Sequence, residues 1–73
     1  MNSEGINVVY KGMKCRLYKS YISEDYGPLV MIVSSKDINK AYELGFECIG
    51  YPTEIAKIIS ENEYNILSTK GYL

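Results

Sequence analysis

Residues able to perform acid–base or nucleophilic chemistry are scarce in this sequence. Its 73 residues include no histidine, the commonest general base and the commonest metal ligand in proteins. A Ser-His-Asp or Cys-His arrangement is therefore impossible, and no Ser-x-x-Lys spacing supplies a lysine in its place. We expect a protein that is not an enzyme and that needs no cofactor.

The only thiols are Cys15 and Cys48, and neither has a Cys-x-x-Cys companion. A structural zinc site needs four ligands, which this chain does not group together. Cys15 lies between Met13 and Leu17 in an alternating segment, which predicts a buried and unreactive thiol. Two cysteines are also too few for a small disulfide-stabilised secreted domain, so we expect a reduced, cytoplasmic protein.

Acidic pairs and glycines do not form a recognisable ligand site. The pairs Glu24-Asp25 and Glu61/Glu63 lack the glycine-bearing loop with alternating acids that binds Ca²⁺. No Gly-x-Gly-x-x-Gly follows a predicted strand, and no Gly-Lys-Ser/Thr opens a helix. We therefore expect neither a metal site nor a nucleotide site.

Charge and tyrosine content single out the first third of the chain as a candidate binding surface. Residues 10–23 hold four basic residues and no acid, whereas residues 41–64 hold five glutamates and one lysine. Such segregation can steer a charged partner or a second copy of the chain. The eight tyrosines suit both core packing and interfaces, because the ring is apolar and the hydroxyl is polar. The candidate residues are Lys11, Lys14, Arg16, Tyr18 and Lys19.

A hairpin is expected to position these candidates. Lys11-Gly12 separates two β-prone segments, and glycine in the second turn position accepts the positive φ of a tight turn. After this turn apolar and polar residues alternate, which predicts a half-buried strand. We place strands at 7–10 and 13–22, and a central strand covered on both faces at 29–33.

The remaining elements are assigned from capping signals and periodicity. Ser34-Ser35-Lys36-Asp37 opens a helix that Gly45 ends, with Ile38, Ala41 and Tyr42 on its apolar side. Beyond it we expect a strand over 46–51, a helix over 54–62 capped by Thr53, and a closing strand over 63–69. The predicted fold is α+β: a small curled antiparallel or mixed sheet of about five strands, an SH3-like or similar partial barrel, with one or two short helices.

Length and composition indicate one small domain over residues 1–73, with 1–5 as a loose N-terminal tail. The first residues carry an acid and no apolar run, unlike a signal peptide, and the longest apolar stretch, 29–33, is too short to span a bilayer. Lys, Ile, Asn and Tyr are frequent while Gln and Trp are absent, which is typical of a low-GC bacterium, its phages or its mobile elements.

Three functions remain open. The first is a non-catalytic protein-binding module, such as an inhibitor or accessory protein, whose partner is another protein. The second is a nucleic-acid-binding small barrel with Lys14, Arg16 and Tyr18 as a basic and aromatic platform, although an isoelectric point near 5.3 disfavours it. The third is a self-associating structural subunit in which the basic hairpin meets the acidic half of another copy.

Overall fold

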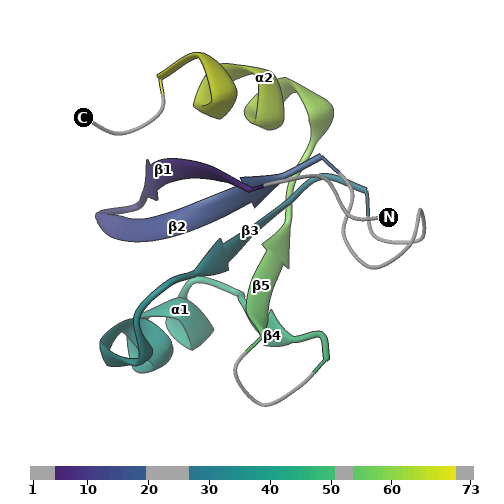
Figure 1. Ribbon diagram of the computed structural model, residues 1–73. Helices are drawn as coiled ribbons and strands as arrows, with labels where there is room; N and C mark the ends of the chain where they lie inside the picture. The colour runs from purple at the N-terminus through teal and green to yellow at the C-terminus, as the bar shows by residue number, and fades with distance from the viewer. Residues whose placement is uncertain (1–4, 20–26, 51–53, 71–73) are drawn as a thin grey trace.

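The computed structural model describes residues 5–19, 27–50 and 54–70, and it forms a five-stranded sheet with two helices (Figure 1). The elements are β1 Ile6–Tyr10, β2 Met13–Tyr18, β3 Leu29–Ile32, the 3₁₀ turn η1 Ser35–Asp37, α1 Ile38–Glu43, β4 Glu47–Cys48, β5 Ile55–Ile58 and α2 Glu61–Lys70. All neighbouring strands are antiparallel in the order β1-β2-β3-β5-β4, so β1 and β4 are the two edges and the sheet does not close. The predicted α+β class, with a curled sheet and short helices, is confirmed.

The hairpin between β1 and β2 follows from its two-residue turn. Lys11 and Gly12 have φ values of 53° and 84°, and positive φ at both central residues is the hairpin turn whose twist matches that of the strands. Tyr10 faces Met13 across the turn, and the register continues to Ile6 opposite Leu17. The strand predicted over 13–22 is confirmed as far as Tyr18; Lys19 is a bend, and residues 20–22 lie outside the described residues.

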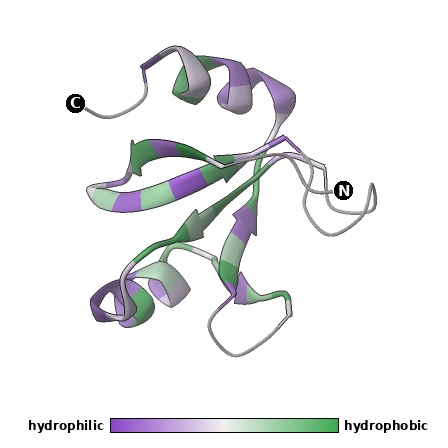
Figure 2. Cartoon of the chain, in the orientation of Figure 1, coloured by the Kyte–Doolittle hydropathy of each residue, from purple (hydrophilic) through white to green (hydrophobic). Residues whose placement is uncertain are grey.

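β3 is the central strand, as its unbroken apolar sequence predicts. All four of its residues are buried, and it pairs with β2 on one side and β5 on the other. Val30 and Ile32 belong to the main core, whereas Leu29 and Met31 belong to a smaller apolar cluster on the opposite face. Figure 2 shows β3 hydrophobic along its length, in contrast to the alternating β2.

The predicted helix after β3 is confirmed, including its ends. The Ser34 hydroxyl accepts a hydrogen bond from the Lys36 amide at 3.2 Å, which caps η1 where it leads into α1. At the other end Gly45 has a φ of 96°, and the amide of Phe46 donates to the carbonyl of Ala41 at 2.9 Å. The placement of Tyr42 on the apolar side of this helix, and so in the core, is wrong: Tyr42 is 49% exposed, because the helix turns Ala41 toward the sheet and the next residue away from it.

The second half of the chain corrects three predictions. The helix expected over 54–62 is strand β5, the strand expected over 63–69 is helix α2, and the strand expected over 46–51 is reduced to the two residues of β4. Residues 55–58 pair with both β3 and β4, and this pairing satisfies their backbone hydrogen-bonding groups. A short helix without such pairing is only marginally stable, so the strand is favoured.

The start of α2 carries a signal that the sequence interpretation missed. The Ser60 hydroxyl accepts a hydrogen bond from the Glu63 amide at 3.1 Å, and Ser60 with Glu63 three residues later is the sequence signature of a capping box. Glu61 and Glu63 also place negative charge in the first turn, near the positive end of the helix dipole.

One face of the sheet carries the main core, and both helices pack against it. The buried side chains of β1 and β2 meet Ala41 of α1 and the loop residue Phe46, while Tyr64 and Leu67 of α2 pack at the border of the same cluster. Tyr10 lies inside it with its ring centroid 5.9 Å from that of Phe46. We call this the covered face and the opposite one the open face.

Candidate binding surface

The alternation of β2 divides its side chains between the two faces of the sheet. Met13, Cys15 and Leu17 are buried on the covered face, whereas Lys14 and Arg16 are exposed on the open face and Tyr18 is half-buried there. The strand period of two places successive side chains on opposite faces, so this division is the one the sequence predicts. Three of the five candidate residues therefore lie in one line on the open face.

The other two candidates lie at the two ends of β2. Lys11 is in the hairpin turn, with its ammonium nitrogen 5.9 Å from the centroid of the Tyr10 ring, and Lys19 is exposed just past the last residue of β2. Neither continues the line on the open face: Tyr10, which lies beside the Lys11 ammonium, is buried on the covered face, and Lys19 follows the open-face residue Tyr18 by one position. Within β2 the basic residues of the open face are Lys14 and Arg16.

Neighbouring strands contribute apolar side chains to the open face that the sequence interpretation did not select. Val9 of β1 is directly opposite Lys14, and Val33, which follows β3, is opposite Lys14 on the other side, with its amide donating to the Lys14 carbonyl at 3.2 Å. Val9, Val33 and Ile58 are 48%, 54% and 55% exposed. The surface is therefore mixed, with cations flanked by solvent-exposed aliphatic residues.

A small apolar cluster supports one end of this surface. Leu29, Met31 and Ala56 are buried on the open face, and Tyr18 and Ile49 pack against them. Tyr18 is directly opposite Leu29, and Arg16 is directly opposite Met31. The Tyr18 ring thus contributes to packing as well as to the surface. At this position the tyrosine has both roles that the sequence suggests for its many tyrosines.

Gly5 fits closely against the same two side chains. A Cβ atom placed on Gly5 would lie 3.0 Å from Cζ of Tyr18 and 3.1 Å from Cδ of Arg16. These distances are shorter than ordinary van der Waals contact, so the absence of a side chain at Gly5 lets the backbone lie on Arg16 and Tyr18. This contact restricts where the two candidate side chains can point.

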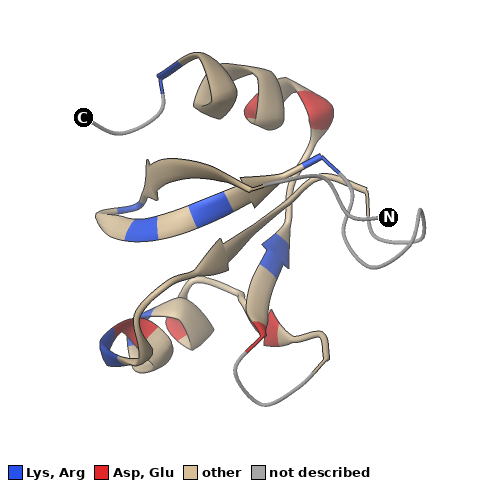
Figure 3. Cartoon of the chain, viewed as in Figure 1, with Lys and Arg blue, Asp and Glu red and all other residues tan. Residues whose placement is uncertain are grey.

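The acidic residues do not form a matching single surface. Figure 3 shows acidic positions on α1, at the start of β4 and in the first turn of α2, which are separate parts of the molecule. They include Glu43, Glu47, Glu61 and Glu63, all of them exposed. Lys14 and Arg16 lie two residues apart on one strand, whereas these acidic residues are divided among three elements.

The two thiols have opposite environments. Cys15 is fully buried on the covered face, and burial, with a smaller effect from the charge of Asp37, raises the pKa of its thiol to about 12. Cys48 is exposed on β4 and donates a weak hydrogen bond to the Gly50 carbonyl at 3.5 Å. The prediction that Cys15 is a core residue is confirmed, and its neutral thiol is a poor nucleophile.

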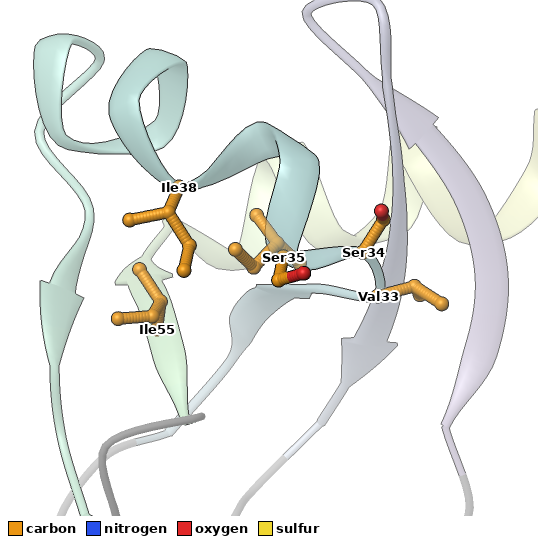
Figure 4. A pocket seen from close by; sticks show the side chains of 6 residues that line it. Val33, Ser34, Ser35, Ile38 and Ile55 are labelled. Atoms are coloured by element: carbon orange, nitrogen blue, oxygen red, sulfur yellow. The ribbon is translucent and has the colours of Figure 1, made fainter.

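The described residues form shallow pockets, of which two have sizes close to those of small ligand sites. One of about 250 Å³ lies between the end of β3, η1 and β5, where Ile38 and Ile55 face each other and Ser34 and Ser35 add hydroxyls (Figure 4). The other, of about 220 Å³, is lined by Val9, Tyr10, Lys11, Glu63, Ile66 and Leu67. Both are smaller than usual sites for small molecules, and within residues 5–19, 27–50 and 54–70 no three His, Cys, Asp or Glu side chains group as metal ligands.

No protein-family model matches the chain, and neither a curated protein nor a solved structure is significantly similar to it. In the described part of the chain, no helix is long and apolar enough to cross a membrane.

Proposed function

We propose that this chain is a small non-catalytic protein-binding module that recognises an acidic surface of another protein with the open face of its sheet. The observation that carries the proposal is the combination of Lys14 and Arg16 with exposed Val9 and Val33 on a face against which neither helix packs. Cations on such a surface give specificity and speed to association, while the aliphatic side chains supply apolar area to bury.

The restrained position of Arg16 favours recognition by this face. The close approach of Gly5 limits the conformations of the Arg16 and Tyr18 side chains before any partner arrives. A side chain that is already ordered loses less conformational entropy on binding. Arginine can also contact a carboxylate through two parallel hydrogen bonds, so an acidic partner would gain a defined orientation there. An inhibitor or accessory protein of a low-GC bacterium, phage or mobile element would act in this way, by occupying a partner's surface.

The proposal is tested by affinity capture from the host, followed by titration calorimetry with the purified partner. The double variant K14E/R16E reverses the charge on the open face, and K36E/K70E makes the same change in net charge on η1 and at the end of α2. We expect K14E/R16E to weaken binding by about tenfold or more, and K36E/K70E to change it only a few-fold. Equal affinity of K14E/R16E and the unmodified protein would refute the open face as the binding surface.

Nucleic acid binding is separated from this proposal by a filter-binding titration. A nucleic-acid-binding surface would retain single-stranded DNA or RNA at low salt and lose it steeply as salt rises. We expect no retention, because Tyr18 packs against the Leu29 cluster and the net charge of the chain is −1.

A further inference from the structure

The two edges of the sheet differ in how well they are protected against pairing with another strand. Natural edges are shortened, charged or covered, because their unpaired N–H and C=O groups can accept a further strand. β4 has only two residues and begins with Glu47, so that edge is short and charged. β1 has five residues, Ile-Asn-Val-Val-Tyr, and none of them is charged. By length and charge β1 is therefore the less protected of the two edges.

The hairpin turn determines which backbone groups of β1 face outward. A two-residue turn makes the flanking residues, Tyr10 and Met13, a hydrogen-bonded pair, and such pairs then alternate with non-hydrogen-bonded pairs along the hairpin. Val8 is thus hydrogen-bonded to Cys15, whereas Asn7 and Val9 direct their N–H and C=O groups away from β2. Within the described residues, no backbone hydrogen bond to Asn7 or Val9 comes from outside the hairpin.

The outer edge of β1, on the side away from β2, remains accessible although α2 lies next to this strand (Figure 1). Asn7 is exposed, Ile6 and Val9 are 36% and 48% exposed, and Ile66 on the neighbouring surface of α2 is 48% exposed. The pocket of about 220 Å³ between Val9 and α2 adds open space beside the hairpin end of this edge. An approaching strand would therefore find unpaired backbone groups together with apolar side chains.

We propose that a second copy of this chain pairs with β1, antiparallel and about a two-fold axis through Val8. In this register Asn7 of each copy lies opposite Val9 of the other. The outward groups are at residues 7 and 9, symmetric about residue 8, so both copies present matching donors and acceptors to each other. Because β1 has no charged side chain, the pairing brings no like charges into opposition along the strand.

This arrangement also has a consequence for the open face. Residues directly opposite each other in an antiparallel pair point to the same side of the sheet, so the open faces of both copies continue into one another. Lys14 and Arg16 of both copies would then lie on one extended surface. The pairing itself uses only the β1 edge and does not depend on those two side chains.

The test uses the full chain in sedimentation equilibrium over a wide range of protein concentrations, with two variants of one residue. Val9→Pro removes an outward N–H while leaving the hydrogen bonds between β1 and β2 in place, and proline is tolerated at sheet edges. Val9→Ala is the matched control, because it shortens the side chain and keeps the N–H. We expect the unmodified protein to dimerise, Val9→Ala to dimerise within a few-fold of it, and Val9→Pro to dimerise about tenfold or more weakly.

Hydrogen exchange of the unmodified protein provides a second measurement, which does not depend on whether a variant folds. The amides of Asn7 and Val9 should exchange more slowly in concentrated than in dilute solution, while the amide of Val8 should not depend on concentration in this way. A protein that stays monomeric at every concentration, or a Val9→Pro variant that dimerises as well as Val9→Ala, overturns the proposal. Loss of partner binding in K14E/R16E with unchanged dimerisation would show that the open face and the β1 edge act separately.

Discussion

The covered and open faces of β2 are built from alternate residues of one strand, yet they have different tasks. Met13, Cys15 and Leu17 are each at most 1% exposed, whereas Lys14 and Arg16 of the same strand are exposed. Burial of apolar area is the dominant stabilising contribution in a chain this small. Stability is therefore concentrated on the covered face, and the residues of the open face can serve recognition with little effect on folding.

The sharpest test of this division compares neighbouring residues on opposite faces. Leu17→Ala should lower the free energy of unfolding by about 3 kcal/mol, since it leaves a cavity in the main core. Arg16→Ala should lower it by less than about 1 kcal/mol, because that side chain is largely in solvent. Urea denaturation followed by circular dichroism measures both values. Similar losses for the two variants would contradict the division between the faces.

Alkaline pH offers a second test of the covered face through Cys15. The folded protein keeps this thiol neutral up to a pKa of about 12, whereas in the unfolded chain it ionises above its ordinary value of 9.0. Above pH 9 the unfolded state therefore binds fewer protons, and Cys15 should lower the free energy of unfolding by about 1.4 kcal/mol per pH unit until pH 12. Below about pH 8 Cys15 should contribute no pH dependence.

The contribution of Cys15 is isolated by comparing urea denaturation of the unmodified protein and Cys15→Ala between pH 8 and pH 11. Other groups titrate in both proteins, so the difference between their slopes reports this thiol. The alanine variant should lack the additional alkaline loss even if it is less stable at neutral pH. Parallel pH profiles for the two proteins would show that Cys15 is not kept neutral by the fold.

A smaller effect is expected at α2, which packs on the covered face next to β1. Ser60→Ala removes the hydroxyl that accepts the Glu63 amide and should cost about 1 kcal/mol of stability. Ser68→Ala, near the other end of α2, is the control, because that hydroxyl donates to the Asn65 carbonyl within the helix and caps no free amide. Equal thermal denaturation temperatures for the two variants would show that the Ser60 cap does not stabilise α2.

The capping box at Ser60 also shows which parts of the fold could be predicted from the sequence. The Lys11-Gly12 turn and the Gly45 cap depend on interactions within a few residues, and both were predicted correctly. The segment 55–59 has its isoleucines at spacings that fit a helix, but its conformation is decided by pairing with β3, which is distant in the sequence. A helix over 54–62 places Ser60 in its interior, where a capping signal for a helix that begins at Glu61 is not recognised.

The candidate surface could also be predicted only where it depends on local sequence. The alternation in β2 correctly placed Lys14, Arg16 and Tyr18 on the side away from the core. Their neighbours Val9 and Val33 could not be assigned to that surface, because it takes the strand order and register to bring them opposite Lys14. The less protected β1 edge likewise requires the strand order, since any strand of the sheet could have been the outer one.

A small stability effect is also expected at Gly5, where a substitution tests folding and recognition separately. Gly5→Ala places a methyl group against Arg16 and Tyr18, whose long side chains can shift, so the free energy of unfolding should change by less than about 1 kcal/mol. Partner affinity should nevertheless fall several-fold, because the two side chains lose the position that the glycine allows. Gly27→Ala is a useful contrast: its φ of 64° strains any side chain, but apart from its two chain neighbours no residue has an atom within 4 Å of the added methyl group. It should lower stability by about 1 kcal/mol and leave affinity unchanged. If Gly5→Ala instead weakens stability and leaves binding intact, Gly5 supports the fold and does not orient the open face.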